Sequence, residues 1–384
     1  MSTSHSRWRL SEDRLPAVVA AAGLFLLAWG LVHLGWWRAQ ITDVPTYELY
    51  GDAIVHHGQV PYRDFSLAYP PGALPVFILP ELVGGYAATF GWLMALCGLA
   101  MLAVVDRVRG RAVWFVAVSP VLVGSLVLTR FDLWPALLAV AALAALLDGR
   151  HRLGWALLGA AVAAKLWPLA LVPLAYAWSR RAGRTEAVLA GAAVAAAWFV
   201  PFGVLGPHGL WETVYGQYDR PLQIESLGAA FLTTFGHPHV VSSHGSQNLA
   251  GEGGVAAALS IATAVSLLAL WTGFVRGPVT RERFVRYAAA VVCATIAFGK
   301  VLSPQYLIWL VPLVPLVRGR RGAVATGLLA SALVLTQVWF PTRYWEYVDG
   351  FRLAGVVLAR DLALVALLAV LALPLRAPLG DVDA

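Results

Sequence analysis

Lysine and cysteine are almost missing from this chain of 384 residues, and charged side chains of any kind are scarce. Charged residues make up 13% of the sequence and hydrophobic residues 59%, with a mean hydropathy of +0.71. This composition excludes a disordered chain and an ordinary soluble domain. The two cysteines, Cys97 and Cys293, both lie inside apolar runs, which argues against a disulfide framework and against a zinc site.

Nucleotide-binding motifs are missing as well. The sequence contains neither a GxxxxGK[ST] loop nor a GxGxxG motif after a strand, and the basic segments between apolar runs are short. ATP-driven transport and use of a cytoplasmic nucleotide-sugar are therefore disfavoured, so an enzyme of this kind needs an activated donor from the lipid phase. The net charge of +7 comes from arginines in these short segments, which is typical of cytoplasmic loops and does not indicate nucleic-acid binding.

Long apolar runs dominate what is present. A membrane-spanning helix needs about 20 residues to cross the hydrocarbon core. Eight continuous runs are candidates: Pro16–Trp37, Tyr86–Val105, Ala112–Leu128, Leu133–Leu147, Ala187–Leu205, Val255–Phe274, Val324–Phe340 and Val356–Leu373. The first run is too long for the apolar part of a signal peptide and lacks a cleavage site, so we expect it to be retained.

Two further segments, Leu153–Trp178 and Tyr287–Val317, each have basic residues on both flanks and one lysine in the middle. A single crossing would leave one basic flank outside, whereas two short helices that meet at Lys165 or Lys300 keep both flanks inside. We therefore predict an all-α polytopic protein with one integral membrane domain over residues 1–384. It has about twelve transmembrane helices, and both termini are cytoplasmic.

The first outer loop, residues 38–85, contains the densest group of acids, tyrosines and prolines, TDVPTYELYGDAIVHHGQVPYRDFSLAYPPG. Asp43 and Tyr47 are four residues apart, as are Glu48 and Asp52, so each pair shares one face of a short helix. We expect juxtamembrane helices here. Polar loops held on a rigid scaffold commonly carry the functional site.

Cations at the membrane boundary are candidates for binding a phosphate. Lys165 and Lys300 are the only lysines among 28 basic residues, and both fall at hairpin turns at the outer edge. Each lysine can equally extend to the headgroups without a specific role. Arg130 begins a later span, where it can bind phosphate or simply pair with Asp132.

A second outer loop, residues 206–254, carries YDRPLQIES. Its Arg220, Gln223 and Glu225 are suited to phosphate and sugar hydroxyl groups. The histidines farther along this loop lack a recognisable ligand spacing, so we expect no metal site and no cofactor, although a divalent cation stays open.

The segments PYRDFSLAYPPGALPVF, AAKLWPLALVPL, YDRPLQIES and LSPQYLIWLVPL together resemble those of the GT-C glycosyltransferases that use polyprenyl-phosphate sugars. Within these enzymes the chain most resembles glycosyltransferase family 87, the bacterial α-mannosyltransferase-like group. The resemblance implies a GT-C bundle in a bacterial plasma membrane, with the active site on the outer face. It implies Asp43 as the catalytic base. Val44 follows Asp43, so the acid pair of some relatives is absent, and Asp52 is the fallback candidate.

This resemblance implies inverting transfer of a sugar from a polyprenyl-phosphate donor to a glycolipid or polysaccharide acceptor. Mannose is the expected sugar. Asp43 would take the proton of the acceptor hydroxyl. The expected donor phosphate-binding residues are Lys165, Lys300, Arg220 and Arg130, and the expected substrate-binding residues are Tyr47, Asp52, Tyr69, Gln223, Glu225 and Gln305. The sequence leaves the oligomeric state open.

Other interpretations remain at this point. A lipid flippase or secondary transporter would place its site near the membrane midplane between repeats, and the two lysine hairpins are faintly symmetric. A non-catalytic membrane assembly protein would not need the acids and tyrosines of the first outer loop. Asp43 itself can serve as the N-cap of a helix over Pro45–His56, a role for which aspartate is favoured.

Overall fold

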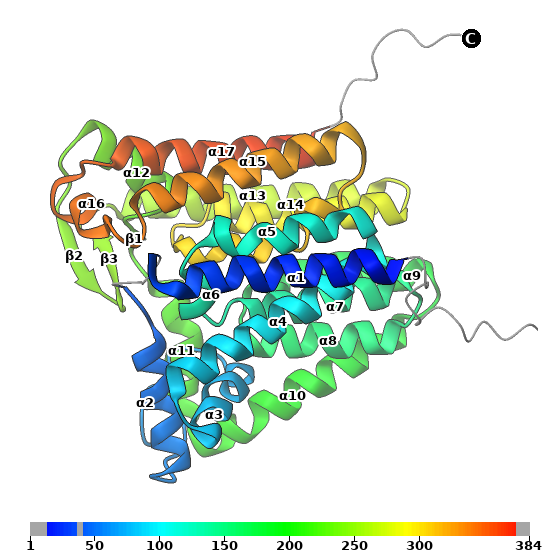
Figure 1. The fold of residues 1–384 in the computed structure, drawn as a ribbon, viewed down its shortest axis with the longest axis horizontal. Helices are drawn as coiled ribbons and strands as arrows, with labels where there is room; N and C mark the ends of the chain where they lie inside the picture. Colours follow the sequence, from blue (N-terminus) through cyan, green and yellow to red (C-terminus); the bar gives the residue numbers. More distant parts are fainter. Residues whose placement is uncertain (1–13, 37–40, 374–384) are drawn as a thin grey trace, which may run out of the picture.

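The computed structural model describes residues 14–36 and 41–373, and its elements are almost all helices arranged as a bundle (Figure 1). The end of the first predicted span, Trp37, and the start of the first outer loop lie outside the described residues. The α-helices are α1 (Leu15–Leu31), α2 (Val44–Val55), α3 (Leu74–Val83), α4 (Tyr86–Val108), α5 (Val113–Val123), α6 (Leu126–Thr129), α7 (Leu133–Leu147), α8 (His151–Ala164), α9 (Val172–Arg181), α10 (Val188–Leu205), α11 (Pro207–Asp219), α12 (Leu227–Phe235), α13 (Gly253–Arg276), α14 (Arg281–Ala297), α15 (Gly319–Trp339), α16 (Tyr344–Gly350) and α17 (Ala354–Ala372).

Six helices in the described residues are long and apolar enough to cross a membrane, which makes the chain an all-α polytopic membrane protein as predicted. They are Leu15–Gly35, Tyr86–Val108, Thr185–Leu205, Gly253–Arg276, Gly319–Trp339 and Ala354–Ala372. Four shorter apolar helices accompany them: Pro71–Val83, Gly110–Val123, Leu133–Leu147 and Pro304–Leu316. The total of about twelve spans, which counts short members, stays a prediction.

Both predicted hairpins are broken at the predicted lysine. Helix α8 ends at Ala164, Lys165 is extended, and a 3-10 turn over Trp167–Leu171 leads into α9. Likewise α14 ends at Ala297, three residues before Lys300, and a 3-10 segment follows over Pro304–Leu310. In the second hairpin Pro304 disfavours helical backbone at Ser303, which is extended. In the first hairpin the extended residue is Lys165 itself, three residues before Pro168.

One predicted span, Ala112–Leu128, is interrupted. Helix α5 stops at Val123 because Gly124 adopts a φ of 67°, and only the short α6 follows. A Cβ atom at Gly124 would lie 2.0 Å from the side-chain oxygen of Gln337 on α15. The amide of Gln337 donates to the carbonyl of Val123 at 2.8 Å, so the side chain occupies the space that a continuing helix would need. The sequence pattern alone did not predict this break.

Helices α14 and α10 differ in how many of their residues are buried. Every residue from Tyr287 to Ala294 of α14 is buried, because the helix lies in the centre of the bundle. On α10 only Gly191 is buried, and it packs against Gly159 of α8. A Cβ atom at Gly159 would lie 2.2 Å from the carbonyl oxygen of Gly191, so the two helices approach through glycine.

The two outer loops contain more regular structure than the sequence predicts. Helix α2 agrees with the expected Pro45–His56 helix to within a residue at each end. In the second loop a small antiparallel sheet has the order β1-β3-β2, formed by β1 (Leu222–Gln223), β2 (Val240–Ser243) and β3 (Ser246–Leu249). This sheet lies beside α16 and, with α2 and α11, occupies one end of the bundle in Figure 1.

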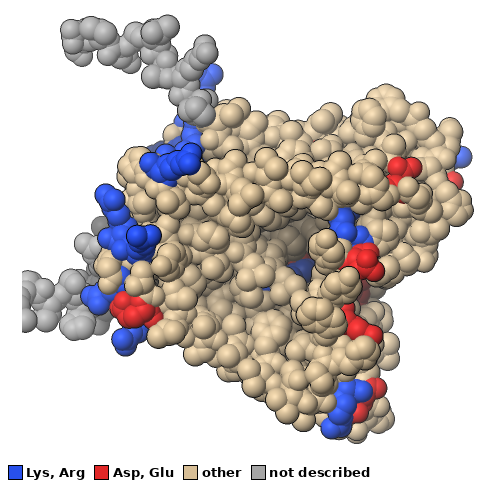
Figure 2. Space-filling model, turned by 180° about the vertical axis from the view of Figure 1, so that it is seen from behind, with Lys and Arg blue, Asp and Glu red and all other residues tan. Residues whose placement is uncertain are grey.

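Charge separates the two ends of the molecule. Helix α9 ends in Arg180 and Arg181, and in Figure 2 blue basic side chains gather at that end, on the left. A hollow with basic and acidic side chains opens farther along, toward the opposite end (Figure 2). This separation is the arrangement that the positive-inside interpretation requires.

Candidate functional site

A cavity of about 740 Å³ lies where the two outer loops meet the turns of both hairpins. Its walls come from segments far apart in the chain: the start of α2, the α6–α7 turn, the α8 turn, α11, the β-sheet and the α15–α16 turn. Of the residues expected to form a site, Asp43, Tyr69, Arg130, Lys165, Arg220, Gln223, Glu225 and Gln305 line this cavity. Its size is in the range typical of small-molecule sites, about 300–1,000 Å³.

Asp43 stands at the N-cap position of α2, but its carboxylate makes no capping hydrogen bond within the described residues. The hydroxyl of Thr42 instead accepts the backbone N–H of Val44 at 3.1 Å. The Asp43 carboxylate forms an ion pair with Arg130 and accepts a hydrogen bond from the Tyr47 hydroxyl at 3.3 Å. The capping interpretation of Asp43 is therefore wrong, and its carboxylate is held at the cavity wall.

Arg130 is 5% exposed and occupies the turn between α6 and α7. Burial lowers the pKa of its guanidinium to about 10, and the nearby Asp132 and Glu225 partly offset that effect. The guanidinium therefore remains charged at neutral pH. The pairing of Arg130 with Asp132, considered from the sequence, is not observed, because Arg130 pairs with Asp43.

Lys165 takes Asp132 as its partner instead. The ammonium Nζ lies 2.6 Å from Oδ1 of Asp132, and the indole N–H of Trp309 donates to the same oxygen at 2.6 Å. The Lys165 ammonium also lies 4.8 Å from the Phe131 ring centre and 5.3 Å from that of Tyr306. These contacts show a charge fixed in an aromatic cage and not a lysine that reaches outward to headgroups.

Arg220 differs from the other two cations of the cavity. Its Nη2 donates to the neutral hydroxyl of Ser246 at 2.9 Å, and no carboxylate of the described residues forms an ion pair with it. Its Nε is buried and has no hydrogen-bond partner among the described atoms. Arg130 also has a buried Nε without a hydrogen-bond partner, but its charge is paired with Asp43. Among the described residues Arg220 is thus the cavity cation whose charge is not compensated by an ion pair.

Glu225 is 2% exposed and forms part of the same cavity. Burial raises the pKa of its carboxyl to about 7, partly offset by Arg360, Gln223 and Tyr344. Arg360 of α17 donates to the backbone oxygen of Glu225 at 2.7 Å, which fixes this segment from behind.

Lys300, Tyr47 and Asp52 are not among the described residues that line the cavity. The Lys300 ammonium donates to the carbonyl oxygen of Tyr218 at 2.6 Å, near the end of α11. Tyr47 is fully buried, with its ring stacked 4.6 Å from that of Phe77, so it supports Asp43 from behind. Because these three residues do not line the cavity, their placement does not match the expected direct contact with a ligand there.

Asp52 belongs to a separate group. The side-chain ligand atoms of Asp52, His56 and Glu81 lie within 4.8 Å of one another. Among the described residues, this is the cluster whose side-chain types and spacing could hold a metal ion. Its members are not among the residues that line the cavity, and side-chain contacts of His56 with Glu81 at 3.0 Å and of His57 with Asp52 at 3.3 Å also account for it. The expectation that the chain has no metal site stays a prediction.

The sequence interpretation missed Arg360 and Asp361. Both are 0% exposed within α17, and their side chains form an ion pair at 2.6 Å. Two adjacent charges inside an apolar run were the available signal, because charged residues at such positions are expensive and usually functional.

Comparisons with known proteins agree with this architecture. The family described as "Glycosyltransferase family 87" matches residues 67–304. A crystal structure of ArnT from Cupriavidus metallidurans bound to undecaprenyl phosphate is similar, with a TM-score of 0.52 and 14% sequence identity. The match covers 93% of this chain and 77% of that one, and at this identity it shows a shared GT-C fold. No curated protein matches the sequence.

Proposed function

Because this chain belongs to glycosyltransferase family 87, we propose that it transfers a sugar, most simply mannose, from a polyprenyl-phosphate donor to a cell-envelope glycan. The observation that carries the proposal is the composition of the cavity. Three carboxylates, Asp43, Glu212 and Glu225, line the same space as three cations, Arg130, Lys165 and Arg220, and Asp43 is the one of these carboxylates that is paired with a cavity cation. The similar ArnT structure binds undecaprenyl phosphate, which supports a lipid phosphate as the donor.

In this mechanism the acceptor hydroxyl loses its proton to Asp43 while its oxygen forms a bond to the anomeric carbon. The bond from that carbon to the phosphate oxygen breaks, and polyprenyl phosphate leaves with the electron pair. The attack and the departure occur on opposite faces, so the anomeric configuration inverts. Arg220 and Lys165 stabilise the negative charge that develops on the leaving phosphate.

The ion pair with Arg130 orients the Asp43 carboxylate but also makes it a weaker base. An acceptor hydroxyl that replaces part of this contact would recover basicity when substrate binds. Tyr47 holds the second oxygen of the carboxylate, so rotation away from the cavity is restricted.

The topology of this proposal places the cavity on the outer face of a bacterial plasma membrane, with both termini in the cytoplasm. The arginines gathered at the opposite end support this orientation (Figure 2). The alternative of a lipid flippase or secondary transporter receives less support, because the described residues that line the charged cavity lie outside the six long apolar helices.

A transfer assay tests the proposal. Purified protein in lipid vesicles is given radiolabelled polyprenyl-phosphate mannose and an envelope glycan fraction, and Asp43→Asn is compared with Asp52→Asn. We expect Asp43→Asn to lower transfer at least about 10²-fold, because it removes the base and keeps the shape. Asp52→Asn should change transfer far less. Near-normal transfer by Asp43→Asn would reject Asp43 as the base, and lipid movement without transfer would favour the flippase.

A further inference from the structure

A second cavity of about 450 Å³ lies beside the first, between the loop over residues 62–66 and the start of α11. Glu212 lines both cavities, so the two spaces are neighbours along α11. The second cavity contains none of the three cations that line the first. The one arginine of its lining, Arg63, is paired with Asp64, so the second cavity offers a phosphate less positive charge than the first.

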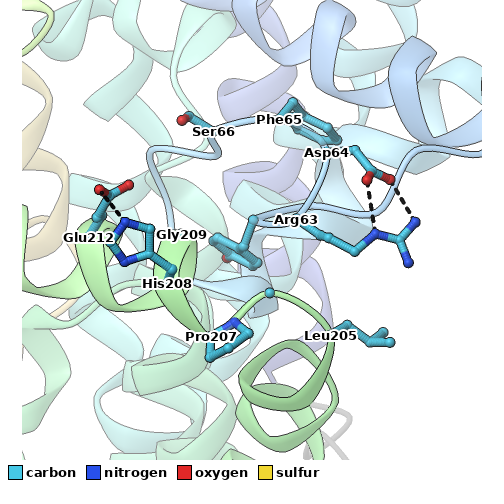
Figure 3. A pocket seen from close by; sticks show the side chains of 11 residues that line it. Arg63, Asp64, Phe65, Ser66, Leu205, Pro207, His208, Gly209 and Glu212 are labelled. Carbon is cyan, nitrogen blue, oxygen red and sulfur yellow. Dashed lines mark hydrogen bonds and ion pairs between the residues drawn. The ribbon is translucent and has the colours of Figure 1, made fainter.

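The polar groups of this second cavity are arranged on two sides, as Figure 3 shows. On one side Arg63 and Asp64 form a two-point ion pair, with both N–O distances 2.9 Å. On the other side His208 lies 3.2 Å from Glu212, one turn farther along α11. Carboxylate, guanidinium and imidazole groups together both donate and accept hydrogen bonds, which suits a ligand rich in hydroxyl groups.

The loop that forms this cavity is held firmly in place. The hydroxyl of Tyr62 donates to the carbonyl of Tyr69 at 2.6 Å, and the Asp64 carboxylate accepts the backbone N–H of Val60 at 2.7 Å. Tyr62 adopts a φ of 67°, a conformation unfavourable for a bulky residue, which the surrounding contacts must maintain. Gly209 permits this close approach, since a Cβ there would lie 2.1 Å from the Tyr62 carbonyl oxygen.

The same contacts couple the two cavities. Tyr69, which accepts the hydrogen bond from Tyr62, lines the first cavity, and so does Thr213, whose hydroxyl donates to the carbonyl of Leu67 at 2.7 Å. A ligand that extends from the first cavity past Glu212 would therefore meet a rigid polar surface.

We propose that the second cavity binds the saccharide part of the acceptor, with the reacting hydroxyl reaching Asp43 past Glu212. As an acceptor subsite it rests on the proposed function, and it sharpens that function: the acceptor is a water-exposed glycan of more than one sugar. A lone lipid-linked sugar bound at Asp43 would not extend to the groups on α11 and the 62–66 loop.

Binding measured separately from catalysis tests this inference. The probe is the water-soluble glycan released by mild acid from envelopes of cells that lack the gene, tritium-labelled and measured by equilibrium dialysis. Ser66→Trp fills the second cavity, and His208→Ala removes a highly exposed side chain that folding does not need. We expect Ser66→Trp to weaken glycan binding at least about 10-fold, because the indole fills the cavity, and His208→Ala about 3-fold, because it removes one exposed hydrogen-bonding group. Ala182→Trp, an exposed position at the basic end, is the matched control and should leave binding unchanged.

A transfer assay on the same variants separates this inference from the proposed function. The half-saturating glycan concentration should rise in Ser66→Trp, while that of polyprenyl-phosphate mannose stays constant. Wild-type protein that does not bind the glycan, or cavity variants that bind it as well as Ala182→Trp does, would overturn the inference. Glycan binding that depends on the second cavity, without any sugar transfer by wild type, would overturn the proposed function and leave the glycan site.

Discussion

The turns at Lys165 and Lys300 look alike in the sequence, yet the two lysines make different contacts in the structure. Each lysine follows a helix that ends early, and each is followed within a few residues by proline. Lys165 enters the cavity and pairs with the buried Asp132, whereas Lys300 turns to the end of α11 and binds a carbonyl oxygen. The local sequence determines the break in the helix, but the neighbours determine what the lysine contacts.

Removing the Lys165 charge is expected to have the largest effect on stability and on transfer. Lys165→Met leaves Asp132 charged and buried, and breaking such a pair is expected to destabilise a protein by about 3–5 kcal/mol. Transfer should fall at least about 10²-fold, because stabilising charge near the leaving phosphate is lost. Both effects are measured in lipid vesicles, by thermal unfolding and by the transfer assay.

The double variant Lys165→Met with Asp132→Asn separates the two effects, since it removes both charges. Stability should return toward wild type while transfer stays low. Recovery of transfer together with stability would show that Lys165 serves only to neutralise Asp132.

Glu225 tests the part of the cavity that the Lys300 backbone holds in place. The carbonyl oxygen of Lys300 accepts the backbone N–H of Gln223, two residues before Glu225, at 2.9 Å. Burial raises the Glu225 pKa from 4.5 to about 7, so between these values the folded protein binds a proton that the unfolded chain releases. The free energy of unfolding should therefore fall as pH rises through this window, by about 3 kcal/mol. In Glu225→Gln this fall should be absent when unfolding is followed in mixed micelles at pH 5 and 7.5. Equal pH dependence in both proteins would show that Glu225 titrates normally.

The smallest expected effect belongs to Lys300. Lys300→Met removes a favourable contact at the carbonyl end of α11, which is typically worth about 0.3–1 kcal/mol. Transfer should fall by less than about five-fold, because only the position of α11 is loosened. Lys300→Arg, which keeps the charge, should stay closer to wild type. A loss of transfer as large as that of Lys165→Met would show that Lys300 also acts on the phosphate. The two lysines would then not differ in function.

Much of the architecture could be predicted because hydrophobicity and charge act locally. Most of the long apolar runs became helices, the basic flanks predicted the breaks at Lys165 and Lys300, and the helical spacing of acids and tyrosines predicted α2. The break at Gly124 escaped prediction because its cause is the side chain of Gln337, more than two hundred residues away in sequence. The small β-sheet of the second loop escaped it because its strands are too short to show alternation.

The sequence by itself determined a polytopic helical membrane protein, its two hairpins, and an unusual group of acids and tyrosines beside the first span. These follow from composition and spacing, which act on each segment independently. Only the tertiary structure decided which charges meet: Asp43 pairs with Arg130 and Lys165 with Asp132, whereas Arg220 has no carboxylate partner among the described residues. Partners so far apart in the chain are chosen by packing, because a buried charge takes whichever compensating group the folded bundle brings within reach.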